Sequence, residues 1–218
     1  MINNRLVNIC LITLGGISVF LTLFPKIDMV CASLFYFENS GFIYKNNFFV
    51  SALFYSIPFL TKIFVSGCCC YLIFIFYKYR NLKNIFNSGA FFLIITAIIT
   101  PGLIVNLGLK ENIGRARPRE IIEFAGSKTF TGAAIPTDQC DSNCSFPSGH
   151  AAMGFYYTAL AYVGNREKFG KIYLAGLLFG AAVGLSRIIM GGHFLSDVII
   201  SGFLVTLSNQ LIFLLWKR

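Results

Sequence analysis

The sequence predicts an all-α membrane protein, a bundle of six transmembrane helices with both termini in the cytoplasm. Three observations predict this architecture. The chain of 218 residues is 56% hydrophobic and only 12% charged, whereas roughly a quarter of an average soluble domain is charged. Its apolar residues gather in runs that approach the length of a bilayer-crossing helix. Its basic residues gather in the segments on one side of those runs.

Six apolar runs are the predicted spans, and with no soluble appendage they make residues 1–218 a single membrane domain. The first run is longer than the apolar core of a signal peptide and lacks a convincing cleavage site, so it is interpreted as an uncleaved helix. The fourth is short and spans the membrane only if its polar start lies at the interface. The runs are Leu6–Phe24, Ile57–Tyr77, Gly89–Leu109, Ser148–Val163, Ile172–Ile189 and Leu195–Trp216.

The basic residues predict the orientation. With a cytoplasmic N-terminus, the inner segments hold nine basic residues and one acid, Glu167, and the opposite side is nearly neutral. The positive-inside rule therefore selects both termini inside. The net charge of +9 follows from this topology, and without a basic patch on a water-exposed face we expect no nucleic-acid partner. The inner basic residues are Arg5, Lys78, Arg80, Lys83, Arg166, Lys168, Lys171, Lys217 and Arg218.

Four further features concern the connections and the packing of the spans. Residues 25–56 are rich in aromatics and predict either an amphipathic helix on the outer leaflet or an aromatic belt. Residues 111–147 are a long outer loop, typical of a lid or specificity element. Pro101-Gly102 predicts a kink, which either aims Lys110 or serves packing. Gly176, Gly180 and Gly184 predict close helix packing.

Of the seven cysteines, Cys140 and Cys144 stand apart because they lie in the outer loop. An oxidising compartment would allow a disulfide between them, which we favour over a pair of free thiols. The other cysteines are interpreted as apolar filler or interface residues. A zinc site is not expected, because its remaining ligands would have to be the two histidines needed for the chemistry below.

Three polar clusters interrupt the apolar sequence, and the predicted topology places all of them on the outer side. The first joins Lys110 to Arg117-Pro118, the second is Pro147-Ser148-Gly149-His150, and the third runs from Ser186-Arg187 through His193 to Asp197. Because charged groups are costly near a bilayer, clusters retained there are candidates for function. They lie within residues 110–197 and supply three cations, both histidines of the chain and one carboxylate.

These residue types suit the cleavage of a phosphate ester. Lys110, Arg117 and Arg187 can hold the phosphoryl oxygens and stabilise their charge in the transition state. The start of the fourth span, at Ser148 and Gly149, adds an anion-binding helix N-terminus.

His193 and Asp197 share one helical face, so the carboxylate can fix the ring tautomer and prepare the imidazole as a nucleophile. His150 is then the general acid that protonates the leaving group. The chemistry requires no cofactor and no metal, since the cations are already supplied and no carboxylate cluster is present to hold an ion.

The three segments resemble the signature of the type 2 phosphatidic acid phosphatase superfamily. The pattern Lys-x6-Arg-Pro, Pro-Ser-Gly-His and Ser-Arg-x5-His-x3-Asp is matched in order and spacing by Lys110–Pro118, Pro147–His150 and Ser186–Asp197. The resemblance implies a metal-independent lipid phosphatase in a bacterial inner membrane, with its active site facing the periplasm. It implies that His193, His150 and Asp197 are catalytic. It also implies that the three cations, together with Ser148 and Gly149, bind the phosphate group.

The implied partners are a lipid phosphate substrate and the surrounding membrane lipids. The stretch Gln139–Phe155, with its paired cysteines, resembles bacterial lipid A 4'-phosphatases. Undecaprenyl pyrophosphate and phosphatidylglycerol phosphate are the alternative substrates. Two other functions stay open: a phosphotransferase that passes the phosphoryl group to a lipid, and a non-enzymatic transporter of anions or lipids. The transporter favours polar groups through the midplane, whereas here they gather at one end.

Overall fold

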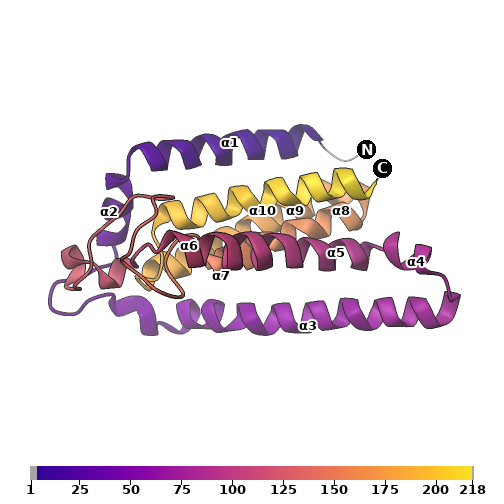
Figure 1. Cartoon of the computed structure of the whole chain (residues 1–218), viewed down its shortest axis with the longest axis horizontal. Coiled ribbons are helices and arrows are strands. Elements are labelled where there is room, and N and C mark those ends of the chain that lie inside the picture. Colours follow the sequence, from indigo (N-terminus) through magenta and orange to yellow (C-terminus); the bar gives the residue numbers. More distant parts are fainter. Residues whose placement is uncertain (1–3, 218) are drawn as a thin grey trace.

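Long helices lie side by side along most of the molecule, as the computed structural model of the chain shows (Figure 1). The structure describes residues 4–217, so Arg218 of the predicted inner cluster lies outside the described residues. The long elements are α1 (Asn4–Leu23), α3 (Phe48–Tyr79), α9 (Phe169–Ile189), α10 (Leu195–Trp216) and the continuous pair α5 (Gly89–Ala97) and η2 (Ile98–Lys110). Residues 4–217 contain no strand, which confirms the all-α prediction.

Five of the described helical segments are long and apolar enough to cross a membrane, so the protein is a multi-pass membrane protein. They correspond to the predicted spans except the fourth. That stretch is divided into α7 (Gly149–Tyr156), η5 (Tyr157–Ala159) and α8 (Leu160–Val163), which together fall short of the roughly 20 residues of a full crossing.

The second span begins nine residues earlier than predicted, at Phe48 rather than Ile57. The side chain of Asn47 accepts hydrogen bonds from the backbone N–H groups of Phe49 and Val50, which caps the helix at this point. An Asn at this position satisfies N–H groups that no carbonyl can reach. The extra turns extend α3 along the site described below.

The third span contains a π-helix, η2, where the sequence predicts a kink at Pro101. Pro101 has no N–H to donate, and the wider turn accommodates it. The side-chain amide of Asn106 donates a hydrogen bond of 2.6 Å to the Pro101 carbonyl. Such turns are rare and are often found at functional sites, and η2 ends at Lys110.

The divided fourth stretch lies at the centre of the bundle, packed against α9 and α10. Most of its side chains are buried and none is exposed, and Phe155 and Tyr156 belong to the main hydrophobic core. A Cβ atom on Gly176 would lie 2.6 Å from the backbone nitrogen of Thr158. This close approach confirms the packing role predicted for the small residues of α9.

Both termini lie at one end of the bundle, and the connections 25–47 and 111–148 cover the other end (Figure 1). Here α2 (Lys26–Ser33) and the loop pack through a second hydrophobic cluster that includes Phe42, Phe124 and Phe194. Part of the aromatic connection is therefore internal, while Phe48 and Phe49 are exposed. The remaining short helices are η1 (Ile43–Asn46), α4 (Leu82–Phe86), α6 (Glu111–Ile113), η3 (Pro118–Glu120), η4 (Ile122–Phe124) and η6 (Arg166–Lys168).

Candidate active site

The three polar clusters occupy the end of the bundle away from the termini (Figure 1). Lys110 is the last residue of η2, Arg187 lies in the last turn of α9, and Asp197 lies in the first turn of α10. Arg117 precedes η3, and His193 stands in the turn between α9 and α10. Each of these side chains is at most 7% exposed, so five ionisable groups are buried at one end of the molecule.

The imidazole of His193 is fixed by a main-chain carbonyl. Its Nδ1 atom lies 2.6 Å from the carbonyl oxygen of Ser145, so Nδ1 carries the proton and donates it there. The other ring nitrogen, Nε2, then holds the lone pair. Burial lowers the pKa of His193 to about 3 although Asp197 counteracts it. The free site therefore holds His193 as the neutral imidazole that a nucleophile must be.

Asp197 stands behind this ring rather than in direct hydrogen-bond contact with it. Its Oδ2 atom is 3.7 Å from Nδ1 of His193. The same oxygen accepts hydrogen bonds from the Ser145 hydroxyl at 2.6 Å and the Phe194 N–H at 2.8 Å. The carboxylate thus acts on His193 through its charge and through Ser145, and the Ser145 carbonyl fixes the tautomer, a role that the sequence assigns to Asp197.

Arg115 and Asp28 complete this network, and sequence reasoning missed both. The guanidinium of Arg115 forms ion pairs with Asp28 at 2.8 Å and with Asp197 at 2.5 Å, and all three side chains are fully buried. Asp28 also accepts the N–H of Ser196 at 2.8 Å. The ring of Phe194 lies 4.3 Å from the guanidinium carbon. A network from α2 therefore supports the carboxylate beside the candidate nucleophile.

The side chains of the three phosphate-binding candidates pair with no carboxylate among the described residues, although the backbone N–H of Arg117 donates to Glu120 at 3.2 Å. Arg117 donates to the Asn143 carbonyl at 2.5 Å. Within residues 4–217, the Arg187 side chain donates to the Met190 sulfur at 3.2 Å, and its buried Nε has no hydrogen-bond partner. The side chain of Lys110, at the end of η2, forms no hydrogen bond or ion pair within residues 4–217. Buried cations without counter-charges are costly, so this arrangement suits an anionic ligand.

His150 opens α7 and faces a cavity of about 250 Å³. Its ring stacks on Phe54, with centroids 4.6 Å apart, and its buried Nε2 has no hydrogen-bond partner in the described part of the chain. Polar and apolar side chains share the lining, as a lipid with a phosphate group requires. The lining residues are Ile57, Pro58, Asn106, Lys110, Asn143, Gly149, His150 and Met153.

The second cluster meets the third at the start of α7. The N–H of Ser148 donates to the Asp197 carbonyl at 3.2 Å, while its hydroxyl oxygen caps the helix by accepting the N–H of Ala151. The N–H groups that open a helix find no carbonyl within it, so those of Gly149 and His150 are suited to an anion at this end of α7. A Cβ atom on Gly149 would lie 2.6 Å from the Asn106 side chain, which explains glycine there.

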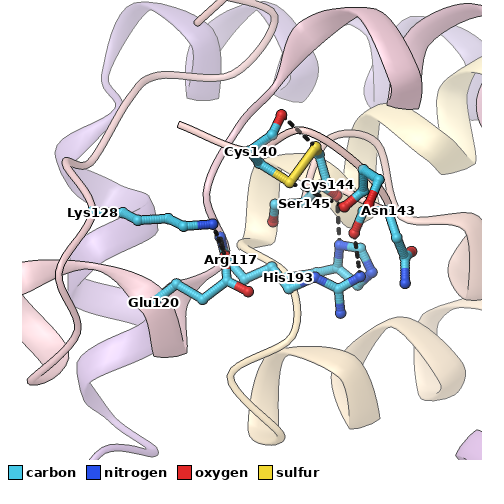
Figure 2. Close-up of a disulfide and its surroundings, with 9 residues drawn as sticks. Arg117, Glu120, Lys128, Cys140, Asn143, Cys144, Ser145 and His193 are labelled. Carbon is cyan, nitrogen blue, oxygen red and sulfur yellow. Dashed lines mark hydrogen bonds and ion pairs between the residues drawn. A yellow bond between two sulfur atoms is a disulfide. The ribbon is translucent and has the colours of Figure 1, made fainter. Parts of the chain in front are cut away.

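A disulfide joins Cys140 to Cys144 directly beside these groups (Figure 2). The loop it closes contains Asn143, whose carbonyl holds Arg117, and leads into Ser145, whose carbonyl holds His193. Figure 2 shows Arg117 and His193 reaching this loop through those two contacts. In the described part of the chain, no three His, Cys, Asp or Glu side chains gather as a metal site would require.

Known proteins identify the family to which this arrangement belongs. The sequence profile of the PAP2 superfamily matches residues 89–218, which include all three clusters. The chain belongs to the PAP2 superfamily. The resemblance to type 2 phosphatidic acid phosphatases drawn from the motifs is thereby confirmed.

Individual curated relatives show which members of the superfamily the chain is similar to. A lipid A 4'-phosphatase of Francisella tularensis subsp. novicida is 32% identical over 92% of this chain and 90% of its own length. A lipid A 4'-phosphatase of Rhizobium etli is 30% identical over 80% of this chain and 73% of its own. A lipid A 1-phosphatase of the same species is 34% identical, but over 48% of this chain and 40% of its own. No solved structure matches the chain.

Proposed function

We propose that this protein removes a phosphate group from a membrane lipid at the periplasmic leaflet through a phosphohistidine intermediate, with the 4'-phosphate of lipid A as the favoured substrate. One observation carries the proposal: three buried cations, whose side chains pair with no carboxylate among the described residues, lie at the same end of the bundle as a neutral imidazole whose tautomer is fixed. The enzyme class itself follows from the family, since the chain is a PAP2 phosphatase with relatives named as lipid A phosphatases.

In the first step, Lys110, Arg117 and Arg187 hold the equatorial phosphoryl oxygens, and the N–H groups that open α7 add neutral donors. The Ser148 hydroxyl, which accepts the Ala151 N–H, keeps its own proton for the phosphate. The lone pair on Nε2 of His193 attacks phosphorus, and the bond to the ester oxygen breaks. Once the bound phosphate offsets the charge of the surrounding cations, His150 takes up a proton, and it then donates that proton to the departing alkoxide, so the lipid leaves as an alcohol.

In the second step, water attacks the phosphohistidine. His150, now neutral, takes a proton from that water as it forms the new bond to phosphorus. The bond between phosphorus and Nε2 breaks, and inorganic phosphate leaves. Through both steps the Nδ1 proton stays on the ring, hydrogen-bonded to Ser145, while the Asp197 charge stabilises the positive ring as it develops.

The proposed topology has six crossings, with both termini in the cytoplasm of a bacterial inner membrane. The central stretch Gly149–Val163 is the short fourth crossing. It is supported by its burial within the bundle, where neighbouring helices rather than lipid surround it. The basic segments at the termini favour a cytoplasmic location. The Cys140–Cys144 disulfide supports an oxidising compartment at the other end.

Lipid A is favoured because the relatives that cover most of this chain carry the 4'-phosphatase name, whereas the 1-phosphatase matches less than half of it. The mixed lining of the cavity beside His150 suits a phosphate joined to an apolar body.

The test is release of inorganic phosphate by the purified protein and by His193→Ala. The substrates are lipid A carrying 1- and 4'-phosphates, undecaprenyl pyrophosphate, phosphatidylglycerol phosphate and phosphatidic acid. We expect release from lipid A, with mass spectrometry showing loss at the 4'-position, and none from the variant. Full turnover by His193→Ala would refute the nucleophile. Labelled phosphate recovered on a second lipid would instead indicate a phosphotransferase.

A further inference from the structure

Phe54, near the start of α3, touches groups from two of the three clusters. Its ring stacks on His150 with an interplanar angle of 20°. The guanidinium carbon of Arg187 lies 4.4 Å from the centre of the same ring. Phe54 lies outside residues 89–218, the part that the superfamily profile matches. The contact is therefore a feature of this chain that the shared motifs do not describe.

Both groups lack strong partners of their own. The Nε2 atom of His150 and the Nε atom of Arg187 are buried without hydrogen-bond partners in residues 4–217. The other contact of Arg187 is the weak acceptor sulfur of Met190. Without Phe54, both side chains would lose the flat surface against which they rest, and each would gain rotamer freedom that substrate binding would have to remove.

An aromatic ring is well suited to hold a cation that must also bind phosphate. Attraction to the ring face orients the guanidinium, while its N–H donors remain in their own plane for phosphate oxygens. A carboxylate at this position would occupy those donors and cancel the charge.

The next turn of α3 continues the same surface. Ile57 and Pro58 follow Phe54 at three and four residues, so the three share one helical face. Ile57 and Pro58 line the cavity that contains Lys110 and His150. This face of α3 thus runs from the cations to the apolar wall of the cavity.

We infer that Phe54 is a positioning residue of the site: its ring holds the Arg187 guanidinium and the His150 imidazole in place for the phosphoryl group. The inference rests on the proposed function and deepens it. It assigns to α3, outside the shared motifs, a direct part in shaping the phosphate site.

The test compares Phe54→Ala, Phe54→Leu and Phe54→Tyr with wild type. Two quantities are measured: kcat and KM on the best lipid of the panel, and inhibition by inorganic phosphate, the product.

Loss of a desolvated cation–π contact predicts that Ala and Leu lower kcat about tenfold and weaken phosphate inhibition by a similar factor. Tyr keeps the ring face and retains most of both. Phe59→Ala is the control, because this α3 residue is 64% exposed.

Leu restores apolar bulk without a ring face, so it separates positioning from simple packing. Wild-type behaviour of Phe54→Leu, or of Phe54→Ala, would overturn the inference. If Phe54→Ala fails to fold, the contrast between Leu and Tyr still decides. If wild type hydrolyses no lipid, the proposed function fails. In that case, the rise in Tm that inorganic phosphate gives to wild type, Phe54→Leu and Phe54→Tyr tests separately whether the ring holds Arg187 for phosphate.

Discussion

The carbonyl oxygen of Ser145 lies 2.6 Å from Nδ1 of His193, whereas Oδ2 of Asp197 lies 3.7 Å from the same nitrogen. The hydroxyl of the same serine donates to Asp197, also at 2.6 Å. Ser145 is therefore the bridge between the candidate nucleophile and the carboxylate. A single residue fixes the ring tautomer with its main chain and the carboxylate with its side chain.

This bridge predicts that Ser145→Ala lowers kcat about tenfold or more with little change in KM. The variant keeps the carbonyl but removes a hydrogen bond to a buried carboxylate, which typically contributes about 1.5–3 kcal/mol. The measurement is steady-state phosphate release. Ser142→Ala is the control, because that side chain is exposed in the same loop. An unchanged kcat in Ser145→Ala would show that Asp197 is held well enough without it.

The buried imidazole predicts a pH dependence of stability. Burial lowers the pKa of His193 to about 3, while in the unfolded chain a histidine titrates near 6.5. Below about pH 6.5 the unfolded chain therefore binds a proton that the folded protein excludes. This contribution to stability is fully present above that pH and is lost as the pH falls toward about 3, by about 1.4 kcal/mol per unit.

Replacing His193 with a side chain that does not titrate removes its contribution to the loss of stability at low pH. We expect His193→Gln to lose less thermal stability than wild type between pH 7 and pH 5 in detergent, measured as the shift in Tm. Each protein serves as its own control at pH 7, so any general effect of the substitution cancels. Equal shifts in the two proteins would contradict the neutral, buried state assigned to His193.

The sequence could point to the cations and histidines of the candidate site because they follow apolar runs at helix ends, where the predicted topology brings them to one face. It could not predict the partner of Arg115. Asp28 lies 87 residues away in the chain, and nothing in the residue types between them marks the pair. Arg115 itself stands among several charges of a polar loop, and only its burial between two carboxylates distinguishes it.

Two other relationships were hidden for different reasons. Main-chain acceptors have no residue-type signature, so the role of the Ser145 carbonyl could not be read from a serine. Phe54 belongs to a segment rich in aromatic residues, of which Phe48 and Phe49 are exposed. Composition cannot tell the ring that meets His150 from those that face outward. The π-helix was likewise missed, because Pro101 marks a disturbed helix without specifying its form.

The ion pair of Asp28 with Arg115 predicts a large loss of stability in Asp28→Asn. Breaking a buried pair by removing one charge typically costs about 3–5 kcal/mol, and Arg115 would be left with Asp197 alone. We expect a clear fall in Tm in detergent together with a reduced kcat, because the carboxylate beside His193 loses its fixed neighbour. Asp141→Asn, in the exposed loop, is the control. A variant with wild-type Tm and kcat would show that the pair contributes nothing.

The position of the Cys140–Cys144 disulfide predicts sensitivity to reduction. The bridge closes a short loop, and the carbonyls of Asn143 and Ser145 reach Arg117 and His193 from that loop and its next residue (Figure 2). Freeing the loop should loosen both contacts, and errors of about 1 Å in such positions are costly to catalysis.

We expect reductant to lower wild-type kcat several-fold, and the double variant Cys140→Ser, Cys144→Ser to be equally slow with or without reductant. Cys69→Ser, an exposed free thiol of α3, controls for effects on other cysteines and should respond like wild type. Full activity of the double Ser variant would show that the loop keeps its shape without the bridge.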